Sequence, residues 1–402
     1  MKFNQWTLGL AAAGVVSLGW AAQAEEAQQA VMTALNSTTI SGYVNTSAIL
    51  RFGHGNISPG RSYDGAAKQD GFNLDVVKLQ IEKPLDEGQW AAGYQIGLLF
   101  GPDASTLNTT STAGWGNSDF AIKDANVTLR APVGSGLDFK MGYWESPIGY
   151  EVFDAGNNPN YSRSFGYFIE PKQFTGLLAS YKFNDMFSAA AGVANRGLDN
   201  FGFWGINPVN TINGRSGADD VLSYLASVAI TAPESAGFLS GGTLYAGIID
   251  SGTDLMGGGN PADIQNYYVG FVVPTPLTGV VFGAAFDYRA SDSSSNPNWD
   301  GSYASTIAGY ISWQATEKMK LNARVEYAKG SDGTWYDTDA DGLKGDSNEL
   351  LGVTATVDYN LWANVLTRLE FRWDHNYAGQ GCFNDGTDEN ALSLALNVIY
   401  KF

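Results

Sequence analysis

Apolar and polar residues alternate along most of this chain with a period of two. In ALSLALNVIYKF, residues 391–402, one side of an extended strand would carry Leu392, Leu394, Leu396, Val398, Tyr400 and Phe402. Small or polar residues occupy most of the positions between them. The same alternation recurs at residues 89–100, 319–329, 350–359 and 365–374. Because successive side chains of a strand point to opposite faces, the pattern predicts strands that are apolar on one face only.

The connections between these strands alternate in length. Short ones are expected at residues 84–88, 132–136, 184–186, 274–279, 316–318 and 360–364. Long ones are expected at 53–70, 101–119, 146–172, 196–219, 251–263, 289–302, 331–348 and 375–389. Together they predict an all-β fold, a transmembrane antiparallel up-and-down β-barrel of about sixteen strands, with short periplasmic turns and long outer loops.

The polar face of the strands distinguishes a barrel from a soluble sandwich or solenoid. Charged residues such as Arg324 and Arg368 fall in the middle of strands, where a packed core would not hold them without partners. A water-filled lumen would accept them. In a bilayer a sheet must close on itself, so we expect the last segment to pair with the strand that begins near Thr39. Aromatic residues at strand ends, such as Tyr359 and Trp362, fit an interfacial girdle.

The N-terminus predicts export from the cytoplasm. Lys2 precedes a short apolar run that ends in Ala22-Gln23-Ala24, which is typical of a signal peptide over residues 1–24. Residues 25–38 would form a short periplasmic segment, and 39–402 the barrel in the outer membrane of a Gram-negative cell. The net charge of −18 argues against nucleic-acid binding. A single cysteine rules out an intrachain disulfide.

Residues 71–200 contain a recognisable run of motifs. The most specific is SPIGYEVFDAGNNPNYSRS from Ser146, supported by EKP at residue 82 and GPDA at residue 101. This run resembles the outer-membrane family named putative β-barrel porin-2, also described as OmpL-like. The resemblance implies a pore. The aromatic Phe402 resembles the signal read by the outer-membrane assembly machinery, and porins of this size are often homotrimers.

In porins the third long loop folds into the lumen and narrows it, and the resemblance assigns that role to residues 146–172. The predicted constriction residues are Glu145, Glu151, Asp154, Asn157, Asn158, Asn160 and Arg163. The predicted basic residues lining the pore are Arg130, Lys320, Arg324, Arg368 and Arg372. Opposed charges would set ion selectivity. Alternatively, the strand charges pair and brace the wall, and the Asn-rich stretch only forms turns that fold the loop.

An acidic stretch in one long loop matches half of a calcium motif. Asp337, Asp339 and Asp341 have the D-x-D-x-D-G spacing, but Glu349 lies one residue too late for the closing ligand. Clustered carboxylates suit Ca²⁺, whereas a solvated acidic loop explains the same residues without a metal. Calcium is the one cofactor that the sequence suggests.

The chain is not expected to be an enzyme. His54 and His375 both fall in long loops, and no strand carries a His beside a nucleophilic Ser. We therefore predict a porin that lets small hydrophilic solutes or ions diffuse passively through a lumen in the outer-membrane lipid. The alternative is a surface-binding barrel, an adhesin or receptor, whose loops bind a ligand; the aromatic stretch from Asn200 fits that role.

Overall fold

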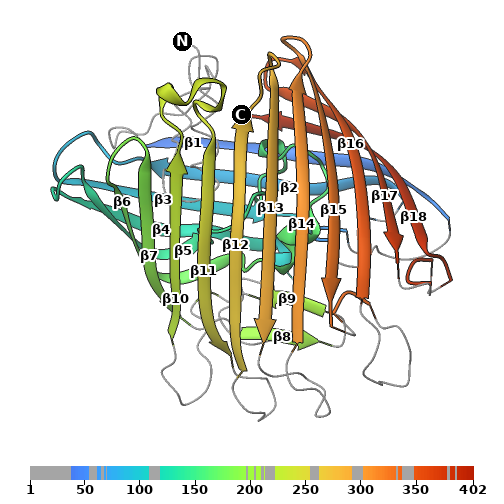
Figure 1. Ribbon diagram of the computed structural model, residues 1–402, viewed down its shortest axis with the longest axis horizontal. Helices are drawn as coiled ribbons and strands as arrows, with labels where there is room; N and C mark the ends of the chain where they lie inside the picture. The colour runs from blue at the N-terminus through green and yellow to red at the C-terminus, as the bar shows by residue number, and fades with distance from the viewer. Residues whose placement is uncertain are drawn as a thin grey trace.

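The computed structural model forms a closed barrel of 16 antiparallel strands (Figure 1). It describes residues 38–53, 61–64, 68, 70–107, 118–195, 198–202, 205–209, 212, 222–253, 262–291, 302–331, 334–336, 348–377, 381–384 and 387–402. The predicted signal peptide, 1–24, and the following segment up to residue 37 lie outside these residues. The predicted fold class is confirmed.

The strands of the barrel are long, as spanning a bilayer at a tilt requires. They are β1 (Thr39–Phe52), β2 (Gly71–Lys83), β3 (Ala91–Phe100), β4 (Phe120–Ala131), β5 (Leu137–Glu145), β6 (Gln173–Lys182), β7 (Phe187–Asn195), β10 (Leu222–Thr231), β11 (Thr243–Thr253), β12 (Ala262–Pro274), β13 (Val280–Ser291), β14 (Ser302–Gln314), β15 (Met319–Gly330), β16 (Asn348–Trp362), β17 (Val365–Asn376) and β18 (Asn390–Lys401). The remaining pair, β8 (Leu198–Gly202) and β9 (Gly205–Val209), forms a separate hairpin in the loop between β7 and β10.

Each strand of the barrel pairs with its neighbours along the chain, and β1 pairs with β18 to close the ring. The closing register runs from Tyr43 opposite Lys401 to Phe52 opposite Leu392. Beyond β18, the backbone groups of Phe402 and Gly42 exchange two hydrogen bonds of 2.9 Å. The ring therefore has no open edge, and the predicted pairing of the last segment with the first strand is confirmed.

The two ends of the barrel differ, and we name them by their connections. At the short-turn end, shown at the top of Figure 1, most strands are joined by a few residues, and the C-terminus lies there. One connection at this end is longer than a tight turn: residues 232–242 contain the 3₁₀ helix η5 (Glu234–Leu239). This connection was not predicted from the sequence. The long loops, with the β8–β9 hairpin, occupy the other end.

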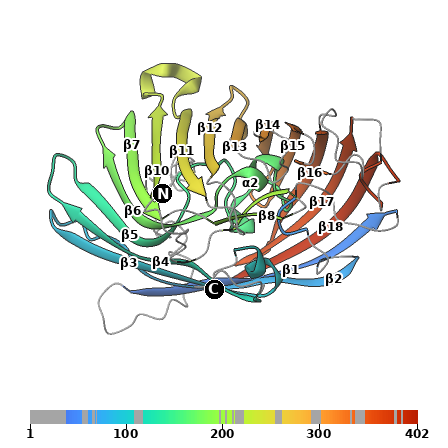
Figure 2. The same ribbon diagram turned by 90° about the horizontal axis from the view of Figure 1, so that it is seen from below.

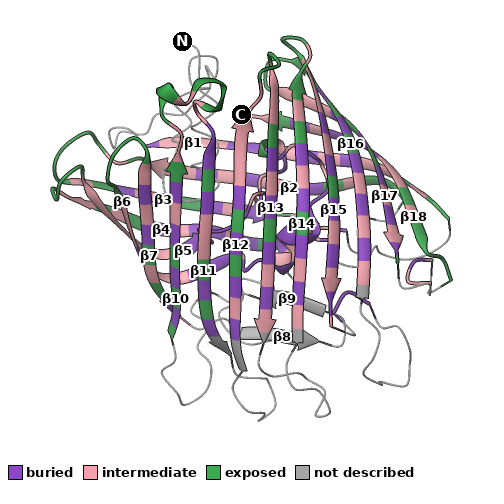
Figure 3. Ribbon diagram, in the orientation of Figure 1, coloured by how far each residue is buried: buried purple, intermediate pink, exposed green. Residues whose placement is uncertain are grey.

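Burial alternates along the strands as the sequence pattern predicts (Figure 3). On β16, Thr354 and Thr356 are buried inside the ring, whereas Ala355 and Val357 are exposed on its outer surface. Apolar side chains thus form the outer face of the barrel. Within the described part of the chain, no helix has the length and apolar character that a membrane span requires.

Aromatic side chains collect at both rims of the barrel. At the short-turn end, Trp362, Phe183 and Tyr400 are exposed on the outer surface. At the long-loop end, the rings of Trp373 and His375 stack with centroids 5.6 Å apart. Amphipathic rings favour the boundary between lipid tails and water, so these positions mark the two interfaces.

Depth in the membrane should decide the effect of a charge on the outer face. Leu396 lies near the middle of β18 and Leu392 near its long-loop end, and both are exposed. We expect Leu396→Arg to lower the free energy of unfolding from lipid by about 2–4 kcal/mol and Leu392→Arg by about 0–1 kcal/mol. Urea titrations of protein folded into vesicles, followed by gel mobility, measure both. Equal effects would contradict the placement of the outer face.

Candidate functional site

The third long loop, residues 146–172, turns into the barrel, and we call it the inserted loop. Its base is closed by a 2.8 Å hydrogen bond from the Ser146 amide to the Lys172 carbonyl. Besides the 3₁₀ helix η4 (Ala155–Asn157), it contains the α-helix α2 (Phe165–Ile169), which packs against β13, β14 and β15, on the wall facing the loop's own strands β5 and β6. Figure 2 shows α2 within the ring of strands.

Apolar contacts hold the first part of the inserted loop. A Cβ added at Gly247 of β11 would lie 2.4 Å from Ile148, and one at Gly283 of β13 would lie 2.1 Å from the Tyr150 hydroxyl. The ring of Tyr150 also stacks on Tyr310 of β14, with centroids 4.0 Å apart. Because real Cβ atoms do not approach so closely, only glycine at these two wall positions leaves room for the loop.

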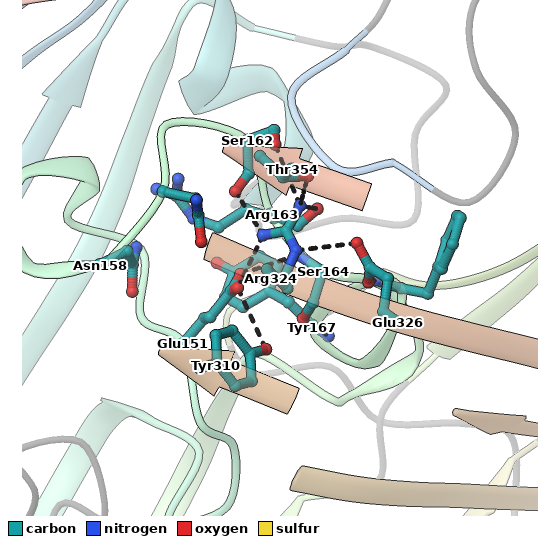
Figure 4. Close-up of polar contacts among 12 residues, drawn as sticks. Glu151, Asn158, Ser162, Arg163, Ser164, Tyr167, Tyr310, Arg324, Glu326 and Thr354 are labelled. Atoms are coloured by element: carbon teal, nitrogen blue, oxygen red, sulfur yellow. Dashed lines mark hydrogen bonds and ion pairs between the residues drawn. The ribbon is translucent and has the colours of Figure 1, made fainter. Parts of the chain in front are cut away.

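Arg324 of β15 is the centre of the polar contacts (Figure 4). Its guanidinium donates to Glu151 at 2.9 Å, to Glu326 at 2.8 Å and to the Ser162 carbonyl at 2.8 Å. All three charged side chains are fully buried. Glu151 also accepts from the Ser164 amide at 2.8 Å. A buried charge is tolerated only when paired and hydrogen-bonded, and here both conditions are met.

Arg61, from the first long loop, completes this cluster. Its guanidinium pairs with Glu326 at 2.5 Å and with Asp374 of β17, and it donates to the Arg163 carbonyl at 2.9 Å. It also lies over the ring of Phe165, 3.8 Å from the centroid. One side chain of the first loop therefore joins the inserted loop to two strands of the wall.

The tip of the inserted loop is held by side chains of β17. Arg368 donates to the Ala155 carbonyl at 2.5 Å and to the Asn158 carbonyl at 2.7 Å, and its Nε lies 3.0 Å from Asp358. Two strand positions further on, Glu370 accepts from the Tyr161 amide at 2.6 Å. Arg368 thus bonds buried carbonyl groups of the loop, and Glu370 bonds a buried amide. Without these wall side chains, the backbone groups would be buried without hydrogen-bond partners.

Asp154 ties the loop to β2, three strands around the ring from β17. Its carboxylate pairs with Lys78 of β2 at 2.8 Å and accepts from the Tyr43 hydroxyl at 2.9 Å. Burial alone would raise the pKa of Asp154, but the ammonium groups of Lys78 and Lys123 outweigh it and hold the pKa well below its usual range. Asp154 is therefore a charged anchor at any pH that the cell meets.

The other predicted loop residues fall into three situations. Asn158 bonds the backbone of Val152 through both its oxygen and its nitrogen, at 2.8 and 2.7 Å, and Arg163 donates to three loop carbonyls. These two side chains fold the loop on itself. Asn160 donates to the wall at Thr356, and Glu145 pairs with Lys123 at 3.0 Å. Only Asn157 is exposed.

Residues before β2 and after β3 add a second layer of charges. Asp64 pairs with Arg372 of β17 at 2.7 Å and with Arg51 of β1. Burial alone would raise its pKa, but the two guanidinium groups lower it below its usual range. Lys68 pairs at 2.5 Å with Asp103, which belongs to the 3₁₀ helix η3 (Pro102–Leu107).

Burial raises the pKa of Asp103 to about 6, against the pull of the Lys68 ammonium. Near pH 6, the Asp103 carboxyl is therefore partly protonated.

A pocket lies between these segments and the wall. It is bounded by the inserted loop, by η3 and by strands β1, β17 and β18, and it is partly open. Its lining combines both charges with hydroxyl and amide groups: Asn45, Arg51, Tyr63, Asp64, Lys68, Asp103, Tyr161, Arg163, Glu370, Arg372 and Ser393. Such a lining suits hydrated, polar solutes.

The predicted basic residues all face inward, but they differ in setting. Arg324, Arg368 and Arg372 contact the inserted loop or the segment before β2. Arg130 instead forms a two-point pair with Asp138, at 2.6 and 2.7 Å, at the short-turn end. Lys320 is half-buried, with no ion pair among the described residues.

Most of the predicted calcium ligands, Asp337, Asp339 and Asp341, lie outside the described residues. Glu349 pairs with Lys329 at 2.7 Å. His54 also lies outside. His375 is placed at the rim, 3.0 Å from the Asn390 side-chain oxygen. Burial raises the pKa of the Cys382 thiol to about 12, so this cysteine stays protonated.

Several contributors were not identified from the sequence. Lys78 and Lys123 occupy inward positions of alternating strands, so counting strand-middle charges over the whole chain would have found them. No local pattern marks Arg61, Asp64 or Asp103, because loop residues carry no period that fixes where they point.

Glu326 offers a direct test of the cluster. Glu326→Gln removes the carboxylate that two buried guanidinium groups share, and breaking such a pair costs about 3–5 kcal/mol. We expect a corresponding loss in the free energy of unfolding, measured by denaturant titration in lipid. The control is Glu317→Gln in an exposed turn, which should change little. Equal stability of both variants would show that the buried cluster does not stabilise the fold.

The family described as "Putative beta-barrel porin-2, OmpL-like" matches residues 37–402. No curated protein sequence matches the chain. The barrel is similar to the outer-membrane channel DcaP of Acinetobacter baumannii, with a TM-score of 0.62 and 13% identity over 93% of this chain and 100% of that one.

Two further solved structures have the same fold. OmpF of Salmonella typhi, solved in complex with daunomycin, has a TM-score of 0.57 and 13% identity, covering 91% and 98% of the two chains. A trimer form of the outer-membrane protein OmpT of Vibrio cholerae has a TM-score of 0.54 and 12% identity, covering 91% and 99%. At such identities the likeness concerns the fold.

Proposed function

Because the chain belongs to the putative beta-barrel porin-2, OmpL-like family of outer-membrane porins, we propose that it lets small hydrophilic solutes or ions diffuse passively through a lumen narrowed by the inserted loop. The observation that carries this proposal is the loop itself. It leaves the wall at β5, contacts β15 through Glu151 and β2 through Asp154, and returns to β6. A segment attached on several sides of a ring reduces the cross-section for flow.

The pairing of charges supports weak rather than strong ion selectivity. Glu151 and Asp154 do not stand free against a basic wall, because each is bonded to a cation of the wall. Charges that neutralise each other at close range contribute little field in the lumen. The mixed lining of the pocket supports passage of polar solutes of either sign.

The setting of the channel follows from the same proposal. Residues 1–24 would direct export, and the short-turn end would face the periplasm. The outer face would contact outer-membrane lipid. Phe402, whose ring lies against Gly42 at the seam, would be read by the assembly machinery before the barrel closes. A homotrimer is proposed by analogy with the trimer form of OmpT.

A surface-binding barrel is the second candidate. The hairpin β8–β9 carries the aromatic stretch from Asn200, and β9 lies against α2 rather than standing away from the barrel. This contact favours a structural role in the lumen over display to a partner.

Calcium binding by the acidic loop remains a proposal that calorimetry with Asp339→Asn would test.

Reconstitution separates the two candidates. Purified protein in planar lipid bilayers should give stepwise conductance, and vesicles that contain it should swell in small sugars. We expect Glu326→Gln, which loosens the inserted loop, to conduct more per step than wild type, while Glu317→Gln conducts equally. A folded barrel that passes neither ions nor sugars would reject the porin proposal.

Asp154 should influence ion preference more than Glu151. Its side chain is 16% exposed, whereas that of Glu151 is fully buried. Asp154→Asn leaves the Lys78 charge without its partner, so we expect the reversal potential in a salt gradient to shift towards anions. Glu317→Gln is the control. An unchanged reversal potential in Asp154→Asn would show that this pair does not border the ion path.

A further inference from the structure

Two acidic side chains meet where the inserted loop returns to the wall. Glu170 follows α2 directly, and Asp287 belongs to β13. Both are buried, with 5% and 4% of their surfaces exposed. Their carboxyl groups are in hydrogen-bonding contact with each other. Two ionised carboxylates cannot share such a bond, so the contact requires one proton.

The backbone of the inserted loop closes over this acid pair. A Cβ at Gly149 would lie 2.5 Å from Oε2 of Glu170, and one at Gly166 would lie 2.3 Å from Oδ2 of Asp287. The Thr306 hydroxyl of β14 donates to Asp287 at 3.4 Å. Oδ1 of Asp287 has no hydrogen-bond partner within the described chain. The pair is thus enclosed and poorly compensated apart from its shared proton.

The charged neighbours do not remove the need for that proton. Glu151 is already paired with Arg324. The ammonium of Lys172 lies 3.4 Å from the centroid of the Tyr167 ring and has no hydrogen-bond partner among the residues described. It can balance one carboxylate but not two.

The other titratable neighbours are phenols. They are Tyr150 of the loop, Tyr167 of α2, Tyr268 of β12 and Tyr310 of β14, and burial raises the pKa of the two that lie in the loop. All of them stay neutral at physiological pH.

We propose that the proton shared by Glu170 and Asp287 is a latch that fastens the end of the inserted loop to β13, and that its loss with rising pH releases the loop and widens the lumen. The widening rests on the proposed porin function, but the latch itself does not. This pair holds the end of the loop, whereas the cluster around Arg324 holds its middle.

The direction of the effect follows from linkage. Burial raises the pKa of Glu170, the Asp287 carboxylate raises it further, and Lys172 opposes both. A released Glu170 would ionise at its ordinary value. Docking therefore gains stability from the proton at low pH and loses it as the pH rises towards the docked value.

Lys172 acts in the opposite sense at higher pH. Burial lowers its pKa to about 8. Below that value the docked loop carries the cost of a buried ammonium, and above it this cost declines. The effect of Glu170 alone is thus seen between about pH 5 and pH 8.

The first experiment measures single-channel conductance across this range. We expect the conductance of wild type to rise with pH beyond the change in the bulk electrolyte. Glu170→Gln supplies an amide that donates to Asp287 at every pH, so its conductance should show no such rise. Glu317→Gln, which removes an exposed carboxyl, should behave as wild type. A wild type without the rise, or a Glu170→Gln variant that keeps it, would overturn the gating.

The second experiment detects the proton without any conduction. Infrared spectra of the folded protein in detergent at neutral pH should contain the carbonyl band of a protonated carboxyl, which Glu170→Gln should lose. Heat-modifiable gel mobility checks that the variant is folded. If wild type lacks the band, the proposed shared proton is absent, and the latch proposal is wrong even if the barrel conducts. If the band is present and nothing conducts, the porin proposal fails and the latch stands.

Discussion

Closure of the hydrogen-bonded ring is the constraint on which the rest of this structure depends. In lipid, every strand edge must be paired, so sixteen strands form a cylinder and divide the alternating side chains between an oily outside and an enclosed inside. That division places Arg324, Arg368 and Glu370 where they cannot reach bulk water freely. Their charges must therefore find partners inside the barrel. The inserted loop supplies them: its carbonyls accept hydrogen bonds from the two arginines, and the Tyr161 amide donates to Glu370.

The loop and the wall therefore depend on each other. Arg324 without Glu151 would lose one of its two buried ion-pair partners, and the loop without the wall would bury unsatisfied carbonyls. Apolar contacts at Ile148 and Tyr150 fix one part of the loop, and ion pairs fix another. An element held in both ways has a defined path across the interior of the barrel.

The fold could be derived from the sequence because a period of two is a local signal. It located nearly every strand, the inward side of Arg372 and the closing partner of residues 391–402. The site was only partly derivable. Its loop residues came from a family resemblance, and their partners, such as Arg61 with Glu326 or Asp154 with Lys78, lie far apart in the chain. Only the closed ring brings them together. The need for glycine at Gly283 likewise becomes clear only when the position of Tyr150 is known.

The seam between β1 and β18 carries a consequence for biogenesis. Tyr43 lies opposite Lys401 across it. During folding, one edge of β1 therefore stays unpaired until β18, the last strand of the chain, is in place. Contacts of such sequence separation form slowly. Throughout that interval β1 exposes unsatisfied amides beside apolar side chains, the combination that recruits stray strands from other molecules. Covering this edge until β18 arrives would therefore protect the folding chain from such pairing.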